Sequence, residues 1–309
     1  MKFAERHNYN RVITVKLVLP EACNYRCEFC YNNDNMVHQT KERFLENFIP
    51  SLDRLLGYIG DKNEVSLDIT GGEPTLFPSF FYEVMRRLKE FEIKKKVLRV
   101  TLTTNGIGLE KCIDSMDGVV DYVNISTHHF DKAERERIFG GKSLDDEDYK
   151  RCVEKLREIG VTTSTCAVIH KEVNRFEDFM ERYVQWCESI GFIALRFRCN
   201  VFWERGDVFD GYMEKALRDS RYTVIDHENT PDSHWCRLRR FDKFRVFFLH
   251  GVKDTSRVTK GIEYVVHDDG EAYCDFYKRK KVNGKMVEVC GVDGIDGMVE
   301  IGKIYDVVE

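Results

Sequence analysis

Strand-like and helix-like segments alternate over the first two-thirds of the chain, and this alternation constrains the fold more than any other feature. Short segments rich in β-branched and apolar residues are typical of strands, as RVITVKLVL at 11–19 is. Longer segments carry apolar residues at helical spacing, as Phe44, Phe48 and Leu52 do. The expected strands are 11–19, 64–70, 97–103, 119–126, 161–169 and 193–199, and the expected helices are 40–59, 78–92, 108–116, 145–159 and 175–190. Six strands with helical crossovers predict a parallel α/β sheet, which could be flat and doubly wound or an open barrel.

Polar motifs follow the first four expected strands. A cysteine-rich loop follows the first strand, Gly71-Gly72-Glu73-Pro74 the second and Thr104-Asn105-Gly106 the third, while Ser126-Thr127-His128-His129 ends the fourth. In parallel α/β folds, ligands bind at the carboxyl ends of the strands. Each motif alone is weak, because a Gly-Gly or Asn-Gly pair is usually only a turn. Their common placement predicts one binding site on that rim.

The loop after the first strand holds three cysteines in the eight residues Cys23-Asn24-Tyr25-Arg26-Cys27-Glu28-Phe29-Cys30. Thiolates this close in sequence can bind three irons of one [4Fe–4S] cube and leave the fourth iron open to a small molecule. A zinc site is the alternative, but zinc sites usually add a second paired motif, and His38 and Cys112 form no such pair. Inert core cysteines are disfavoured because the loop is polar.

Composition limits the other function classes. The chain has 309 residues, of which 42% are hydrophobic, so it can bury one large core and a smaller appendage. No apolar run approaches the roughly 20 residues that span a bilayer, and no charged-then-apolar leader is present, which predicts a cytoplasmic protein without a membrane partner. The net charge of −5 gives no strong signal for nucleic-acid binding. Eleven cysteines in such a chain indicate reduced thiols and metal ligation rather than disulfides.

The spacing Cys23-x3-Cys27-x-Phe29-Cys30, paired with Gly71-Gly72-Glu73-Pro74, resembles the signature of the radical S-adenosylmethionine (SAM) enzymes over roughly residues 10–200. The resemblance implies an open six-stranded (β/α) barrel that holds a [4Fe–4S] cluster and SAM. It also implies that SAM chelates the open iron and that one electron splits it into methionine and a 5′-deoxyadenosyl radical, which removes a hydrogen atom from the substrate. A one-electron donor such as flavodoxin or ferredoxin is then expected.

The same resemblance implies roles for individual residues. Iron would be bound by Cys23, Cys27 and Cys30. Phe29 would pack near the adenine, Gly71 and Gly72 would let the backbone approach the methionine part of SAM, and Glu73 would meet its ammonium group. The remaining rim residues expected to face SAM or substrate are Thr104, Asn105 and Ser126, with Val168 and Arg198 as candidates for the adenine cradle. His128 is a candidate for proton transfer, although a hydrogen-bonded bystander is the commoner role.

The last third of the chain changes character. Hairpin signals around Asp268-Asp269-Gly270 and Asn283-Gly284 predict a small, mainly antiparallel extension. We therefore expect a core barrel at 1–205 and an extension at 206–309 that closes the barrel mouth. The stretch 269–274 is similar to the hairpin of the Twitch and SPASM extensions, which hold auxiliary iron–sulfur clusters. The candidates for a second cluster are Cys236, Cys274 and Cys290, with burial as small apolar side chains as the alternative.

The substrate is less constrained than the cofactors. Because the expected barrel begins near residue 10, an N-terminal peptide-recognition domain has no room, which favours a small polar substrate such as a nucleotide or amino-acid derivative. The alternatives are a peptide or protein substrate, and a non-catalytic iron–sulfur or zinc protein. Arginines of the basic run 237–245 could face the barrel mouth and bind a phosphate or carboxylate, although a solvated face is the default for such a run.

Overall fold

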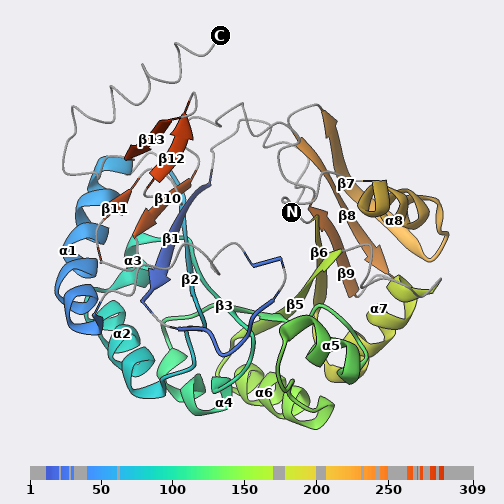
Figure 1. The fold of residues 1–309 in the computed structure, drawn as a ribbon, viewed down its shortest axis with the longest axis horizontal. Helices are drawn as coiled ribbons and strands as arrows, with labels where there is room; N and C mark the ends of the chain where they lie inside the picture. The colour runs from blue at the N-terminus through green and yellow to red at the C-terminus, as the bar shows by residue number, and fades with distance from the viewer. Residues whose placement is uncertain are drawn as a thin grey trace.

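The computed structural model describes residues 12–20, 22–27, 29–30, 40–60, 63–169, 178–199, 207–230, 233–240, 244–249, 263–266, 270, 272–273, 279–282 and 285–288. All six expected strands are present in sequence order: β1 (Ile13–Leu19), β2 (Val65–Gly71), β3 (Arg99–Thr104), β4 (Tyr122–Ser126), β5 (Thr162–Ile169) and β6 (Ala194–Cys199). Each pairs with the next in parallel. The strands curve into an open barrel with the helices outside (Figure 1), so the flat doubly wound alternative is wrong.

Helices cover the outer face of the strands, as predicted. They are α1 (Lys41–Ile59), α2 (Pro78–Glu90), α4 (Leu109–Cys112) with a 3₁₀ turn at Ile113–Met116, α6 (Asp146–Glu158) and α7 (Phe179–Ile190). The α1 helix shows why such a segment is helical and packs on the strands. Thr40 caps its first turn by accepting a hydrogen bond from the Arg43 amide. Phe44, Phe48 and Leu52 form its fully buried stripe. Each such side chain contributes roughly 1.5–3 kcal/mol by leaving water.

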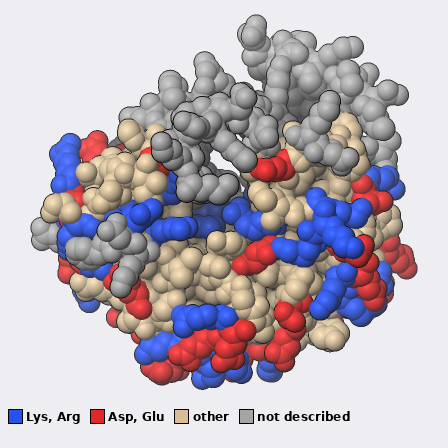
Figure 2. Space-filling model, turned by 180° about the vertical axis from the view of Figure 1, so that it is seen from behind, with Lys and Arg blue, Asp and Glu red and all other residues tan. Residues whose placement is uncertain are grey.

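The strands alternate between an apolar outer face and a polar inner face. Along β1, Val15 and Leu17 are fully buried beneath the helices, whereas Thr14 and Lys16 between them are half-buried. Because side chains of successive strand residues point to opposite faces, the half-buried set faces the barrel lumen. On the far side of the molecule, Lys and Arg side chains gather in a band that enters the central hollow (Figure 2). The lumen is therefore polar and charged.

The C-terminal part adds strands to both edges of the barrel. Next to β6 lie β9 (Phe244–Leu249), which is parallel to it, and the antiparallel β8 (Ser233–Arg240) and β7 (Tyr222–Thr230). Next to β1 lies β10 (Glu263–Val266), again parallel, with β11 (Ala272–Tyr273) antiparallel to it. A separate hairpin joins β12 (Arg279–Val282) to β13 (Lys285–Glu288).

Both hairpins expected in this part are thereby confirmed, and the antiparallel character holds for β7, β8, β11 and the β12–β13 pair. Strand β9 was not predicted, and β10, which was expected only as one arm of a hairpin, also pairs in parallel with β1. The expected domain boundary at 205/206 borders residues outside the described part of the chain, and the division stays a prediction. None of the helices in the described residues combines the length and apolar composition that a bilayer span requires.

Three helices were not predicted: α3 (Ile93–Lys96), α5 (Lys132–Phe139) and α8 (Asp207–Arg218). The α5 helix has no apolar stripe long enough to be seen as a helical period, but its ends carry clear signals. Asp131 caps it by accepting a hydrogen bond from the Glu134 amide at 3.1 Å, and Gly140 ends it in the left-handed conformation at φ 63°.

The fully buried guanidinium of Arg135 holds α5 in place. It donates to the carbonyl of Phe130 at 2.7 Å, to the hydroxyl of Ser143 at 3.1 Å and to the carboxylate of Asp146 at 2.8 Å. It also packs against the rings of both Tyr149 and Trp186, with its central carbon 5.3 and 5.0 Å from their centroids. These contacts fix α5 against α6 and α7.

Replacing Arg135 with alanine should lower the free energy of unfolding by about 3 kcal/mol, because buried acceptors lose a charged donor and a cavity forms. Urea unfolding followed by tryptophan fluorescence measures the change. Arg137→Ala is the matched control on the same helix, since Arg137 pairs only with Glu134 at the surface, where its side chain is 44% exposed. Its effect should stay within about 0.5 kcal/mol. Equal effects of the two substitutions would contradict the assigned role of Arg135.

Candidate functional site

The cysteine loop between β1 and α1 is fastened to the end of α5. The ring of Tyr25 is buried and stacks on Phe139, with centroids 4.3 Å apart and planes 7° from parallel. Its hydroxyl donates to the carbonyl of Lys142 at 2.8 Å. The amide of Arg26 donates to the carbonyl of Phe139 at 2.9 Å. Sequence reasoning missed this anchor because it missed α5.

The three cysteines of this loop are half-buried free thiols. Burial raises the pKa of Cys23 and raises that of Cys27 to about 12, with Cys30 and Cys23 adding to the effect at Cys27. Neighbouring thiolates repel one another, which favours the protonated thiols while no cation is bound. A cationic iron group bound to all three would stabilise the thiolates and displace the protons. Cys23 already accepts a hydrogen bond from the Tyr25 amide at 3.4 Å, which favours its thiolate.

The donor chemistry of the cysteine loop fits an iron–sulfur cluster. In a cube, each thiolate binds a different iron. His38, a ligand candidate of the zinc alternative, lies outside the described residues. The donor set is also all thiolate, which is the usual ligand set of such a cube.

Glu73 connects the Gly-Gly-Glu-Pro motif to the end of β3. Its carboxylate is 1% exposed and accepts hydrogen bonds from the Thr75 amide at 2.9 Å, the Thr75 hydroxyl at 2.6 Å, the Thr104 hydroxyl, and the Asn105 amide at 2.6 Å. Burial raises the pKa of Glu73, and these donors oppose the rise. The sequence did not indicate that Thr75 belongs to this site. Its hydroxyl and that of Thr104 both donate to Glu73 Oε1.

Asn105 extends this connection to the cysteine loop. Its side-chain amide donates to Asn24 Oδ1 at 3.0 Å and lies 3.9 Å from Cys23 Sγ. The Glu73 amide also donates to the carbonyl of Ala22 at 3.3 Å. Two rim motifs and the cysteine loop, which are far apart in sequence, are therefore joined by hydrogen bonds. This confirms that the polar motifs after β1, β2 and β3 come together at one rim; that the rim binds a ligand stays a prediction.

Gly71 lets β1 and β2 approach each other where the cysteine loop begins. It has φ 151°, and a Cβ atom placed on it would lie 2.6 Å from the carbonyl oxygen of Leu19. Any other residue would therefore push the two strand ends apart. Gly72, the next residue, is half-buried in the turn that leads to Glu73. That these glycines admit the methionine part of SAM stays a prediction.

His128 packs against the cysteine loop and is held in its neutral form. Its ring meets that of Phe29 edge-on, with centroids 4.7 Å apart, and its Nδ1 accepts a hydrogen bond from the Val168 amide at 3.2 Å. Burial lowers the pKa of His128 to about 3, and the positive charge of Arg198 adds to the effect. A neutral, buried ring with an occupied Nδ1 suits the bystander role better than proton transfer.

This histidine should make the stability of the protein depend on pH. Since its pKa is about 3 in the folded state and 6.5 ordinarily, the unfolded chain takes up the proton first. The stabilisation is complete above pH 6.5 and falls by up to about 1.4 kcal/mol per pH unit as the pH drops below that value. His128→Asn keeps an acceptor and suits the backbone, whose φ is 60° here. In urea unfolding between pH 7.5 and 5.5, the wild type should lose stability more steeply than this variant. Parallel pH profiles would contradict the prediction.

Ser126 ends β4 at the same rim as predicted, and its hydroxyl lies 3.5 Å from the sulfur of Cys166 on β5. Cys112, Cys152 and Cys187 belong to the hydrophobic core. Cys236 on β8 is also buried in that core, and burial raises its pKa to about 12. Cys274 and Cys290 lie outside the described residues, so the auxiliary cluster stays a prediction.

The basic run 237–245 has mixed roles. Arg240, which we considered as an anion ligand at the barrel mouth, is buried and pairs with Glu181 and Glu188 on α7. Arg237 pairs with Asp226 on the neighbouring strand. Arg245 is exposed on β9. For Arg240 the expectation is wrong, because β8 turns its side chain outward onto α7.

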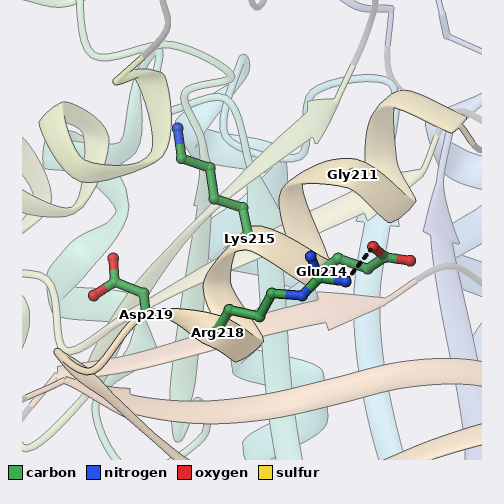
Figure 3. A pocket seen from close by; sticks show the side chains of 5 residues that line it. All are labelled: Gly211, Glu214, Lys215, Arg218 and Asp219. Carbon is green, nitrogen blue, oxygen red and sulfur yellow. Dashed lines mark hydrogen bonds and ion pairs between the residues drawn. The ribbon is translucent and has the colours of Figure 1, made fainter.

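A surface pocket of about 410 Å³ lies on α8 (Figure 3). Its lining is Gly211, Glu214, Lys215, Arg218 and Asp219. Arg218 and Glu214 form a solvent-exposed ion pair at 3.3 Å, with 81% and 61% of their side chains exposed. The pocket contains none of the residues expected to bind a cofactor, and we assign it no role.

Three comparisons place these features among known proteins. The family model of the radical SAM superfamily matches residues 17–183, which include the cysteine loop, Glu73, Asn105 and Ser126. A GTP 3′,8-cyclase of Actinobacillus pleuropneumoniae serotype 3 (strain JL03) is 27% identical over 180 residues, which cover 57% of this chain and 50% of that protein. A probable GTP 3′,8-cyclase of Pyrobaculum aerophilum is 28% identical over 59% of this chain and 56% of that protein. The chain thus spans about half the length of these curated relatives.

Among solved structures, native anSMEcpe with bound AdoMet and Cp18Cys peptide covers 95% of this chain and 82% of its own, with a TM-score of 0.59. The same protein with AdoMet alone gives a TM-score of 0.54 and covers 93% of this chain. Sequence identities of 18% and 16% limit this likeness to the fold.

Proposed function

The chain belongs to the radical SAM superfamily, and from this premise we propose that it is an enzyme that starts radical chemistry on a small polar substrate with a [4Fe–4S] cluster and SAM. The observation that carries the proposal is the set of hydrogen bonds from Glu73 and Asn105 to the cysteine loop. These bonds hold the start of the cysteine loop beside the Gly-Gly-Glu-Pro turn, as one site for both cofactors requires.

Each residue then has a role in this proposal. Cys23, Cys27 and Cys30 hold the cluster, and the turn at 71–73 holds the methionine part of SAM. When bound, the two cofactors supply an electron and a 5′-deoxyadenosyl radical that removes a hydrogen atom from the substrate. Glu73 Oε2 accepts one hydrogen bond from the described residues, from the Asn105 amide, so it is the carboxylate atom best able to accept another from the SAM ammonium.

The rim residues complete the cofactor site in this proposal. Asn105 orients Asn24 and Cys23, and Phe29 and Ser126 flank the space beside the loop. The buried rings of Tyr25, Phe139 and His128 exclude water from the loop's inner side, which protects reactive species from side reactions.

For the substrate, we propose a nucleotide or a related small polar molecule. The curated relatives are GTP 3′,8-cyclases by name, which supports a nucleotide, although they share only about half of their length with this chain. A peptide substrate is the alternative outcome of the test below. We also propose a cytoplasmic enzyme with a one-electron donor such as flavodoxin or ferredoxin.

Anaerobic reconstitution with iron and sulfide, followed by reduction with dithionite in the presence of SAM, tests the core of the proposal. Formation of 5′-deoxyadenosine, measured by mass spectrometry, is the expected result. Its absence under all reducing conditions would overturn the proposal. Deuterated nucleotides then test the substrate class, because hydrogen abstraction transfers deuterium into 5′-deoxyadenosine. Deuterium transfer from a peptide but from no nucleotide would establish the alternative.

A further inference from the structure

Cationic side chains from three strands line the barrel lumen below the cysteine loop. We define the lumen cluster as Lys16 on β1, Asp68 on β2, Arg99 on β3, and Arg196 and Arg198 on β6. Lys16 lies opposite Asp68 in the β1–β2 pairing, and the two β6 arginines lie opposite Cys166 and Val168 on β5. These residues alternate with fully buried outward residues such as Leu17, Ile69 and Phe197. They therefore point into the lumen.

The charges of the cluster act on Asp68 and Arg196. Burial raises the pKa of Asp68, while Lys16, Arg99, Arg198 and Arg196 all oppose that rise. Burial lowers the pKa of Arg196, and the like charges of Arg198 and Arg99 lower it further. Four cations and the Asp68 carboxylate therefore lie close enough in the barrel to influence one another.

The three arginines of the cluster form no salt bridge with any described residue. Arg99 has a hydrogen bond to the hydroxyl of Ser66 at 3.4 Å, and Arg196 lies 5.8 Å from the ring centroid of Phe247. By contrast, the buried Arg135 and Arg240 are each paired with carboxylates. Arg196 is half-buried, whereas Arg99 and Arg198 are exposed to solvent. Like charges in the cluster repel one another, and a bound anion would relieve that repulsion.

The lumen cluster reaches the cofactor site. Arg198 lies opposite Val168, whose amide donates a hydrogen bond to His128 Nδ1 at 3.2 Å, and the ring of His128 contacts Phe29 of the cysteine loop. An anion held by Arg198 would therefore lie below the loop, where a substrate has to reach the cofactors. The band of Lys and Arg that enters the central hollow (Figure 2) leads to the same interior from the opposite side.

We propose that the lumen cluster binds the phosphate groups of the substrate, with Arg196 and Arg198 as direct ligands. The claim that the bound phosphate belongs to a substrate rests on the proposed function. The anion-binding site itself is independent of radical chemistry. Guanidinium groups bind phosphate oxygens in pairs of parallel hydrogen bonds. Asp68 alone does not balance the charge of the three arginines, whereas a multiply charged phosphate chain would match it.

The test is isothermal titration calorimetry of the reconstituted full-length protein with tripolyphosphate, and with glutamate at equal ionic strength. The wild type should bind tripolyphosphate and show at least tenfold weaker binding of glutamate. Arg198→Gln and Arg196→Gln should each weaken tripolyphosphate binding about tenfold or more, as loss of a charge-assisted hydrogen bond predicts. Arg198→Lys keeps the positive charge but not the paired hydrogen bonds of a guanidinium. Its affinity for tripolyphosphate should therefore lie between those of the wild type and Arg198→Gln. Arg218→Gln, at the exposed arginine of α8, is the matched control and should bind like the wild type.

Two results would overturn the inference: unchanged tripolyphosphate affinity in both glutamine variants, or glutamate binding as tight as that of tripolyphosphate. Substrate-free formation of 5′-deoxyadenosine, measured on the same preparations, separates this inference from the proposed function. If the wild type forms no 5′-deoxyadenosine but binds tripolyphosphate through Arg196 and Arg198, the proposed function fails and the anion site stands. If it cleaves SAM and the variants bind tripolyphosphate unchanged, the anion site fails alone.

Discussion

Replacing Glu73 with alanine should abolish SAM cleavage and lower the free energy of unfolding by about 3 kcal/mol. The Thr75 and Thr104 hydroxyls can turn to other acceptors, since Thr75 already lies 2.7 Å from the carbonyl of Ile107. The amides of Thr75 and Asn105 are fixed and would lose their acceptor, at a cost of roughly 1–3 kcal/mol each. The end of β3 would then separate from the Gly-Gly-Glu-Pro turn, and Asn105 would no longer hold the cysteine loop.

Glu73→Gln distinguishes the scaffold role of this residue from a contact with SAM. The amide keeps the volume and one acceptor oxygen, so stability should fall less than in the alanine variant, by about 1–2 kcal/mol. If the carboxylate also meets the SAM ammonium, the glutamine variant should lose SAM affinity beyond what its stability explains. Urea unfolding, SAM titration and 5′-deoxyadenosine yield measure these effects. Glu42→Ala, at an exposed position of α1, should leave all three unchanged. Full activity in Glu73→Ala would contradict the role assigned to the hydrogen-bond network.

The barrel was predictable because its signals are local. Strands such as β1 and helices such as α6 carry their apolar residues at the periods that their structures require. Parallel pairing and outward helices then follow from the alternation itself. The convergence of the rim motifs was predictable for the same reason, since parallel strands all end at one edge. What the alternation could not decide was curvature, because a flat sheet and an open barrel present the same pattern along the chain.

The features that the sequence did not predict depend on contacts between distant segments of the chain. The α5 helix is polar along most of its length and is fixed by one buried arginine, which no periodicity reveals. The parallel pairings of β9 with β6 and of β10 with β1 join segments that follow no helical crossover pattern. Arg240 was misjudged because a run of arginines does not show which of them a strand turns outward. The lumen cluster was not recognised either, since its members come from strands β1, β2, β3 and β6.

Substituting serine for Cys27 should prevent assembly of the cluster and abolish 5′-deoxyadenosine formation. Two thiolates cannot anchor a cube that three were placed to hold, and a serine hydroxyl is a much poorer iron ligand at neutral pH. The same result is expected for Cys23→Ser and Cys30→Ser. Iron content, charge-transfer absorbance and the electron paramagnetic resonance signal after reduction measure cluster assembly, and mass spectrometry measures the product.

The matched control is Cys187→Ala, because Cys187 is fully buried on α7 within the hydrophobic core. This variant should keep the cluster and lose only about 1 kcal/mol of stability from the cavity that it leaves. The contrast separates ligand thiols from packing thiols, which composition alone treats alike. If the Cys27 variant retained the iron and the resonance signal of the wild type, that cluster would have to be held elsewhere. The link from the cysteine loop through Asn105 to Glu73 would then have no bearing on catalysis.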